Sequence, residues 1–282
     1  MTMSKSVQPI GVFDSGLGGI SVLREIHRLL PQEELIYIAD SGHAPYGSKS
    51  SAYITQRCLQ LSEFLLEQGA KMLVVACNTA TAHAIDTMRE QLNVPVIGIE
   101  PAVKPAARLT KTGVIGVLAT QQTVKSQRLQ RLIHEYASGV KVVAQGCPGL
   151  VEHVERGDFS SLELRALLAE YTQPLTEQGS DVLVLGCTHY PFLASTLREI
   201  VGCDMTILET SNAVAQHVMR LLDKHGLKAH GEQEGSVSFY SSKADLSHWQ
   251  SMQLLWQQNL TKAMLPEAYL TIPPQKLAQD QQ

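Results

Sequence analysis

The sequence lacks an excess of charge of either sign, and it lacks any long hydrophobic run. Its 282 residues include 23 Lys and Arg against 27 Asp and Glu, a formal net charge of -4. This near balance gives no general electrostatic attraction to nucleic acid or to an anionic membrane, so we expect neither as a partner. The longest apolar runs, such as 72–77, have the length of a strand, far below the roughly 20 residues that span a bilayer. Without the apolar stretch and cleavage site of a signal peptide, we expect a cytoplasmic protein.

The cysteines also lack the spacing of known frameworks. An odd number, widely scattered along a chain of this length, does not indicate disulfide bonding. No CxxC pair is present, which argues against a zinc ribbon or a thioredoxin-type site, and no ligand-spaced cluster predicts a metal. In a reducing compartment all of them would be free for chemistry or for packing: Cys58, Cys77, Cys147, Cys187 and Cys203.

What the sequence does contain is a regular alternation of two patterns. With 44% hydrophobic and 18% charged residues, it is not a disordered chain. Short runs rich in Val, Ile and Leu are typical of parallel strands buried on both faces; they occupy 9–14, 35–40, 72–77, 94–99, 114–119, 140–145, 181–187 and 205–209. Longer amphipathic stretches between them predict helices, for example 20–30, 52–69 and 162–179. Strict alternation predicts an α/β fold with doubly wound, mainly parallel sheets.

Two stretches resemble each other, at 74–82 and 184–192. Each has an apolar strand, then Cys, then Thr, then a helical pattern. We therefore expect two similar doubly wound lobes with the active site in the cleft between them. The first lobe would comprise 1–99 plus 208–282 and carry Asp14 and Cys77; the second would comprise 100–207 and carry Cys187 and His189. In the tail, a strand is expected at 236–240 and a helix at 244–258, with irregular structure beyond.

Polar residues follow several of the predicted strands, at the edge of the sheet where α/β proteins bind ligands. The first strand ends in Asp14 and a glycine-rich segment, 16–19, which differs from GxGxxG and lacks the P-loop lysine. A tight turn and an anion-binding loop are both compatible with this segment. The carboxylate of Asp14 disfavours phosphate and suits an amino group or a base. Asp40, after the second strand, is expected to cap a loop.

Cys77 and Cys187 end the third and the seventh predicted strands. Each precedes polar residues that begin a helical pattern, and the positive end of a helix favours the thiolate form of a cysteine. We therefore expect two reactive thiols in matching positions. His189 lies two residues from Cys187 and could orient or protonate a group there. Of the other cysteines, Cys58 and Cys203 are expected to be structural, and Cys147 stays open.

Three kinds of chemistry could use such thiols. A single thiol with a His base would make a hydrolase and leave the second cysteine without a role. A redox pair is usually close in sequence. Proton transfer at a carbon stereocentre requires one base on each face, which two thiols on opposing lobes would supply. The matched pair favours proton transfer.

The motifs FDSGLGG, PYG, ACNTAT, GCTHYP and IGIEPAVKPA resemble the cofactor-independent glutamate racemases of the aspartate/glutamate racemase superfamily, over about residues 10–222. The resemblance implies two α/β lobes and interconversion of L- and D-glutamate without a cofactor, pyridoxal phosphate included. It also implies a product used for peptidoglycan synthesis, and hence a role in cell wall biogenesis and cell shape. Members differ in how they dimerise, and some are activated by a cell-wall precursor, so a homodimer and such an activator are candidate partners. The alternatives are a racemase of aspartate or another amino acid, or a non-catalytic amino-acid-binding protein.

The resemblance also implies roles for individual residues. Cys77 and Cys187 would be the paired acid and base, assisted by Asp14 and His189 respectively. Glu155, in CPGLVEHVE, falls where the family places a carboxylate near His189, although Glu152 is a rival. The substrate carboxylates and ammonium would be bound by side-chain and backbone groups of Asp14, Ser15, Pro45, Tyr46, Gly47, Asn78, Thr79, Thr188 and His189.

Overall fold

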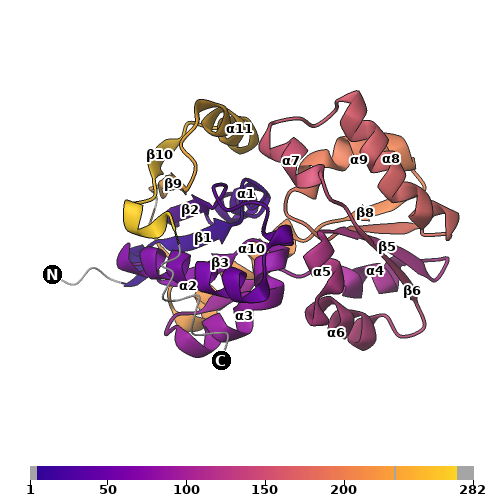
Figure 1. Cartoon of the computed structure of the whole chain (residues 1–282). Coiled ribbons are helices and arrows are strands. Elements are labelled where there is room, and N and C mark those ends of the chain that lie inside the picture. The colour runs from indigo at the N-terminus through magenta and orange to yellow at the C-terminus, as the bar shows by residue number, and fades with distance from the viewer. Residues whose placement is uncertain (1–4, 232, 272–282) are drawn as a thin grey trace.

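The computed structural model describes residues 5–231 and 233–271, which form two parallel sheets with helices around them (Figure 1). The first sheet has the strand order β10-β9-β2-β1-β3-β4 and the second β6-β5-β7-β8. All adjacent pairs run parallel, which confirms the predicted α/β class. None of the helices in the described ranges is long and apolar enough to cross a membrane.

Strands β1 to β8 coincide with the apolar runs of the sequence. The strands are β1 (Ile10–Asp14), β2 (Leu35–Ala39), β3 (Met72–Val75), β4 (Val96–Gly98), β5 (Val114–Ala119), β6 (Lys141–Gly146), β7 (Val182–Leu185), β8 (Thr206–Leu208), β9 (Val237–Ser241) and β10 (Thr261–Met264). The α-helices are α1 (Ile20–Leu29), α2 (Ser51–Glu67), α3 (Asn78–Gln91), α4 (Val103–Leu109), α5 (Gln121–Lys125), α6 (Gln127–Tyr136), α7 (Leu150–Glu155), α8 (Leu162–Glu177), α9 (Ala194–Val201), α10 (Ser211–His225) and α11 (Leu246–Trp256). Short 3-10 helices lie at Lys5–Val7, Tyr46–Ser48, Tyr190–Leu193 and Glu267–Tyr269.

The centre of each sheet is buried on both faces, which explains why its strands are continuously apolar. Every residue of β1 is buried, and Val12 pairs with Tyr37 on one side and with Val74 on the other. In the second sheet β5 has the same position, with Val117 paired to Ala144 and Val184. Burial of such runs is the main source of stability in this architecture.

The strand order repeats between the sheets. The sequence β2-β1-β3-β4 in the first corresponds to β6-β5-β7-β8 in the second, so β3 and β7 are equivalent strands. Cys77 and Cys187 therefore follow equivalent strands of two different sheets. This repeat explains the likeness of 74–82 and 184–192 in the sequence. The lobe boundaries at 99/100 and 207/208 stay a prediction.

The C-terminal part departs from the repeat. The strand and helix expected at 236–240 and 244–258 correspond to β9 and α11. The irregular structure expected beyond them is wrong for Thr261–Met264, which pairs with β9 as an edge strand. All four of its residues are exposed, so the strand has no alternation of apolar and polar positions that would reveal it. The last part of the predicted tail, 272–282, lies outside the described residues.

Candidate active site

A small cavity lies between the two lobes, at the carboxyl ends of the strands. Cys77 and Cys187 both line it and are only 4% and 6% exposed. One cysteine follows a strand of the first sheet and the other a strand of the second, so the two thiols reach the cavity from different lobes. The complete lining is Ser15, Pro45, Tyr46, Gly47, Cys77, Asn78, Thr79, Thr120, Val151, Cys187, Thr188 and His189.

Asp14 lies behind Cys77, fully buried at the end of β1. Its carboxylate accepts hydrogen bonds from the backbone N–H groups of Ser15 at 2.7 Å and Gly19 at 2.5 Å, and from the Thr188 hydroxyl at 3.2 Å. Burial raises the pKa of Asp14, and its contacts offset this only in part. The Cys77 thiol donates to the Ser15 hydroxyl across 3.5 Å. Asp14, Ser15, Cys77 and Thr188 thus form one connected group.

Cys187 has a different partner, the imidazole of His189. Nδ1 of His189 lies 3.8 Å from the thiol sulfur, and Nε2 lies 2.7 Å from Oε1 of Glu155. Burial alone would lower the pKa of His189, but the contacts with Cys187 and Glu155 outweigh it and raise the pKa well above its ordinary value. Burial would raise the pKa of Glu155, but His189 lowers it. The contact to His189 comes from Glu155, and Glu152 instead lines a neighbouring pocket.

The glycine-rich segment after Asp14 packs against this second group. The backbone N–H of Leu17 donates to Oε1 of Glu155 at 2.5 Å. A Cβ atom at Gly16 would collide with the Glu155 carboxylate, and one at Gly18 would collide with the His189 ring. The glycines therefore permit a close approach between the two lobes. This favours the tight turn over the anion-binding loop, and the turn also makes room for Glu155 and His189.

The two cysteines differ in their local structure, and here one expectation was wrong. Cys77 caps α3, and its sulfur accepts from the Ala80 N–H at 3.5 Å. Cys187 is followed by the 3-10 helix Tyr190–Leu193, with His189 as its N-cap, so no α-helix begins at this cysteine. At Cys77 the expected thiolate is not favoured either. Burial, and then the charge of Asp14, raise the pKa of this thiol well above its ordinary value and outweigh the helix N–H.

Among the residues expected to bind substrate, Asn78 has a donor left over. Its Nδ2 atom is buried without a hydrogen-bond partner in the described part of the chain. The hydroxyl of Thr79 lies 2.8 Å from that of Thr120, which comes from the other lobe. Buried donors without partners are rare because each costs free energy, so a donor facing a cavity indicates a missing acceptor.

Tyr46 and Asp40 have other partners than expected. The Tyr46 hydroxyl donates to the Asp40 carboxylate at 2.6 Å, so it is not free for a ligand. Asp40 does not only cap a loop, since its side chain is fully buried and forms an ion pair with Arg57 at 2.5 Å. Sequence reasoning missed Thr120 and Val151 in the cavity lining. Thr120 follows β5 and Val151 lies in the first turn of α7. Neither threonine nor valine indicates a functional site by its residue type alone.

The remaining cysteines lie outside the cavity. Cys58 and Cys147 are buried, and burial raises the pKa of Cys147 to about 12. Cys203 is exposed, so the structural role expected for it in packing is wrong. In 5–231 and 233–271, no three His, Cys, Asp or Glu side chains are placed to hold a metal ion.

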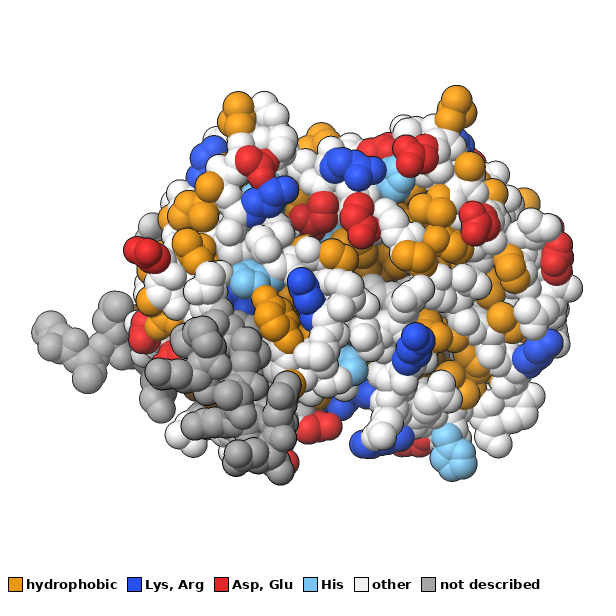
Figure 2. All heavy atoms as spheres, in the orientation of Figure 1, with side chains coloured by type: hydrophobic (Ala, Val, Ile, Leu, Met, Phe, Trp, Pro, Cys, Tyr) orange, Lys and Arg blue, Asp and Glu red, His pale blue; other side chains and the backbone are white. Residues whose placement is uncertain are grey.

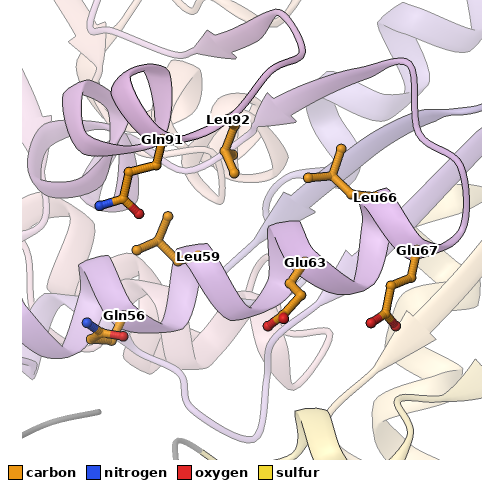
Figure 3. A pocket seen from close by; sticks show the side chains of 7 residues that line it. All are labelled: Gln56, Leu59, Glu63, Leu66, Glu67, Gln91 and Leu92. Atoms are coloured by element: carbon orange, nitrogen blue, oxygen red, sulfur yellow. The ribbon is translucent and has the colours of Figure 1, made fainter.

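A larger groove lies elsewhere, along the outer side of the first lobe between α2 and α3 (Figure 3). It shares no residue with the cavity between the lobes, and its lining of leucines, glutamates and glutamines contains no cysteine and no histidine. Figure 2 shows charged side chains of both signs scattered over one face of the molecule, in keeping with the balanced composition. Size alone therefore does not identify the site, whereas the convergence of thiols and titratable partners does.

Comparisons with known proteins indicate the family to which the chain belongs. The family model of the Asp/Glu/Hydantoin racemases matches residues 10–218. A curated glutamate racemase of Methylococcus capsulatus is 52% identical over 254 residues, which cover 90% of this chain and 94% of the relative. The glutamate racemase of Francisella tularensis, solved in complex with D-glutamate, has a TM-score of 0.82 at 29% identity, covering 93% and 98% of the two chains.

A third relative is the Escherichia coli glutamate racemase, solved with L-glutamate and the activator UDP-MurNAc-ala. Its TM-score is 0.81 at 31% identity, over 91% of this chain and 97% of that chain. The alternative of a non-catalytic binding protein loses its support, since these relatives are enzymes. The chain therefore belongs to the Asp/Glu/Hydantoin racemase family and, within it, to the glutamate racemases.

Proposed function

We propose that the protein interconverts L- and D-glutamate by moving the α-proton between the thiols of Cys77 and Cys187. The observation that carries this proposal is that both thiols line one buried cavity and come from different sheets. A substrate Cα held between them can lose its proton on one face and receive another on the opposite face. That exchange inverts the configuration without a cofactor.

The partners of the two thiols support different starting roles. Cys187 faces an imidazole whose pKa is raised well above its usual value, chiefly by its contacts with Cys187 and Glu155, so a positive charge on this ring would stabilise negative charge on the Cys187 sulfur. Cys77 lies beside Asp14, and its raised pKa favours the neutral thiol. In the free enzyme Cys187 would act as base and Cys77 as acid.

The proton balance follows from these states. Cys187 takes the proton from Cα, and the electron pair left on carbon takes the proton of the Cys77 thiol on the other face. Cys77 is then a thiolate and Cys187 a thiol, which is the state that the reverse reaction requires. Each direction of the reaction thus begins from the opposite protonation state.

The α-proton of an amino acid is weakly acidic, so the site must stabilise the negative charge that spreads onto the α-carboxylate. The unpartnered Nδ2 of Asn78 and the backbone N–H groups at the start of α3 provide donors without further reorganisation. Most of the side chains that line the cavity are buried, which limits the water around the reacting atoms and strengthens these interactions. Asp14 does not itself line the cavity; Ser15 and Thr188, whose hydroxyls donate to its carboxylate, would orient the ammonium. Gly47 and Thr79 would orient a carboxylate.

The biological setting is also a proposal. D-glutamate made in the cytoplasm would supply peptidoglycan synthesis, as the family resemblance implies. The Escherichia coli relative was solved with UDP-MurNAc-ala as activator, which supports a cell-wall precursor as an activator here. Racemisation measured with and without UDP-MurNAc-ala tests this, and sedimentation tests the homodimer; unchanged rates or a monomer would count against either partner.

The proposed mechanism is tested by following the circular dichroism of L- and D-glutamate over time. The wild type should racemise both enantiomers. Cys77→Ser and Cys187→Ser should each lose racemisation, because a serine hydroxyl is far too weak an acid to replace a thiol. Parental rates in either variant would refute the two-thiol mechanism.

A further inference from the structure

An ion pair between Asp40 and Arg57 lies beside the cavity, and the proposed mechanism does not use it. Nε and Nη2 of Arg57 donate to the two carboxylate oxygens at 2.8 and 2.5 Å. Both side chains are 0% exposed. A buried pair of this kind adds little net stability over well-packed apolar residues, because both charges lose their hydration. Its presence therefore calls for a role in holding particular groups in place.

On one side the pair holds the loop that borders the cavity. Oδ2 of Asp40 accepts a hydrogen bond from the Tyr46 hydroxyl at 2.6 Å, and Tyr46 is 1% exposed. With its hydroxyl occupied, Tyr46 can present only its backbone and ring edge to a ligand. Pro45, Tyr46 and Gly47 line the cavity together, and a Cβ at Gly47 would meet Thr120 at 3.2 Å. The position of this loop thus defines one wall of the site.

On the other side Arg57 holds the C-terminal segment Glu267–Tyr269 and the residues that follow it. Nη1 of Arg57 donates to the carbonyl of Tyr269 at 2.6 Å and to Oε1 of Gln60 at 2.6 Å. Nε2 of Gln60 in turn donates to the carbonyls of Ala268 and Thr271 at 3.0 and 2.7 Å. All four of these hydrogen bonds are made by one guanidinium and one neighbouring amide on α2.

A second link runs parallel to the first. Nε2 of His43, in the loop between β2 and Pro45, lies 2.6 Å from the carbonyl oxygen of Leu270. The ring of Tyr269 packs edge-on against Phe64 of α2, with centroids 5.2 Å apart. The segment is therefore attached both to the helix that carries Arg57 and to the loop that Asp40 begins.

We propose that Arg57 is a positioning residue for the racemase reaction, which couples docking of the C-terminal segment 267–271 to the placement of the substrate-binding loop 45–47. The inference rests on the proposed function, since it takes this loop to bind glutamate. Arg57 itself does not line the cavity, so it acts through Asp40 and Tyr46. We call the hydrogen bonds that run from the C-terminal segment through Arg57 and Asp40 to Tyr46 the relay. Weakening the relay should raise the dissociation constant of the substrate more than it slows the proton transfer between the thiols.

The test compares two variants: Arg57→Lys in the full-length chain, and a chain shortened to end at residue 266. A lysine has one ammonium in place of the fork and cannot keep both Asp40 and the Tyr269 carbonyl. Both changes should raise KM for glutamate about tenfold, as expected for the loss of a charge-assisted hydrogen bond, with a smaller effect on kcat. Combining them should raise KM no further, because both interrupt one relay.

Controls separate this from a loss of folding. Arg24→Lys alters another arginine that donates to a C-terminal carbonyl, that of Leu255, away from the cavity, and should leave KM unchanged. Tyr46→Phe removes the last link alone and should reproduce the rise in KM even if Arg57→Lys does not fold. Unchanged KM in Tyr46→Phe and in the truncated chain would overturn the inference. Absence of racemisation in the wild type would instead overturn the proposed function.

Discussion

Replacing Glu155 by glutamine isolates the contribution of the carboxylate behind His189. Oε1 of Glu155 lies 2.7 Å from Nε2 of His189, and the two side chains are 16% and 2% exposed. Glutamine has nearly the same shape and keeps an oxygen for the Leu17 N–H, but it carries no charge. Contacts with Cys187 and Glu155 raise the pKa of His189 against burial, so removing this charge lowers that pKa and reduces the share of imidazolium beside Cys187.

The magnitude follows from the kind of hydrogen bond that is lost. A hydrogen bond to a charged, buried partner contributes about 1.5–3 kcal/mol, so kcat/KM at neutral pH should fall by roughly 10- to 150-fold. L- and D-glutamate have equal free energy, so kcat/KM must fall by the same factor in both directions. The individual kcat and KM values are free to differ between them.

The pH dependence carries a definite sign. The imidazolium is lost as pH rises through the pKa of His189, which lies above its usual value in the wild type. In Glu155→Gln that pKa is lower, so the alkaline limb of the kcat/KM profile should move to lower pH. Racemisation followed by circular dichroism from each enantiomer, across the pH range, measures this.

A matched control lies on the same helix, α7. Glu152→Gln removes an equal charge three positions earlier, where the side chain lines the neighbouring pocket and not the His189 site. Its kcat/KM and pH profile should stay at wild-type values. The reasoning is refuted if the two variants fall equally, or if Glu155→Gln leaves both the rate and the alkaline limb unchanged.

Three further substitutions test separate parts of the account. Burial is the largest cause of the raised pKa of Cys77, and the charge of Asp14 is the second, so Asp14→Asn should lower this pKa. Alkylation of Cys77, followed by mass spectrometry, should then begin at lower pH, and an unchanged midpoint of alkylation against pH would contradict this. Gly18→Ala places a methyl group against the His189 ring and should lower kcat/KM about 100-fold, whereas a wild-type rate would mean that the lobes adjust freely. Cys58→Ala, in the core of the first lobe, should cost about 1–2 kcal/mol in the free energy of unfolding measured with urea and leave kcat intact, so a large loss of kcat would show that Cys58 contributes to catalysis.

The main frame of the fold could be predicted because burial on both faces leaves a plain pattern. The strands at Ile10–Asp14 and Val182–Leu185 are continuously buried, and their apolar runs stand out in the sequence. The exposed edge strand Thr261–Met264 has no such pattern and was missed. Its position depends on hydrogen bonds to β9, which only the folded sheet provides.

The candidate site could be predicted in part. The repeated strand–Cys–Thr pattern predicted that Cys77 and Cys187 would meet, since equivalent strands of a duplicated fold end at equivalent places. The raised pKa of Cys77 could not be predicted from its position at a helix start, because burial and the nearby Asp14 dominate there. The partners Thr120 and Arg57 are ordinary residues in the sequence, and only the approach of distant segments gives them a role.

The central claim is that two different thiols handle the departing and the arriving proton. The most direct test is racemisation of L-glutamate in D2O, stopped early and analysed for deuterium at Cα in each enantiomer. Two exchangeable thiols predict that the D-glutamate formed carries solvent deuterium, while the remaining L-glutamate carries almost none. D-glutamate that retains the original α-proton would show that one base returns the same proton, and would contradict the account.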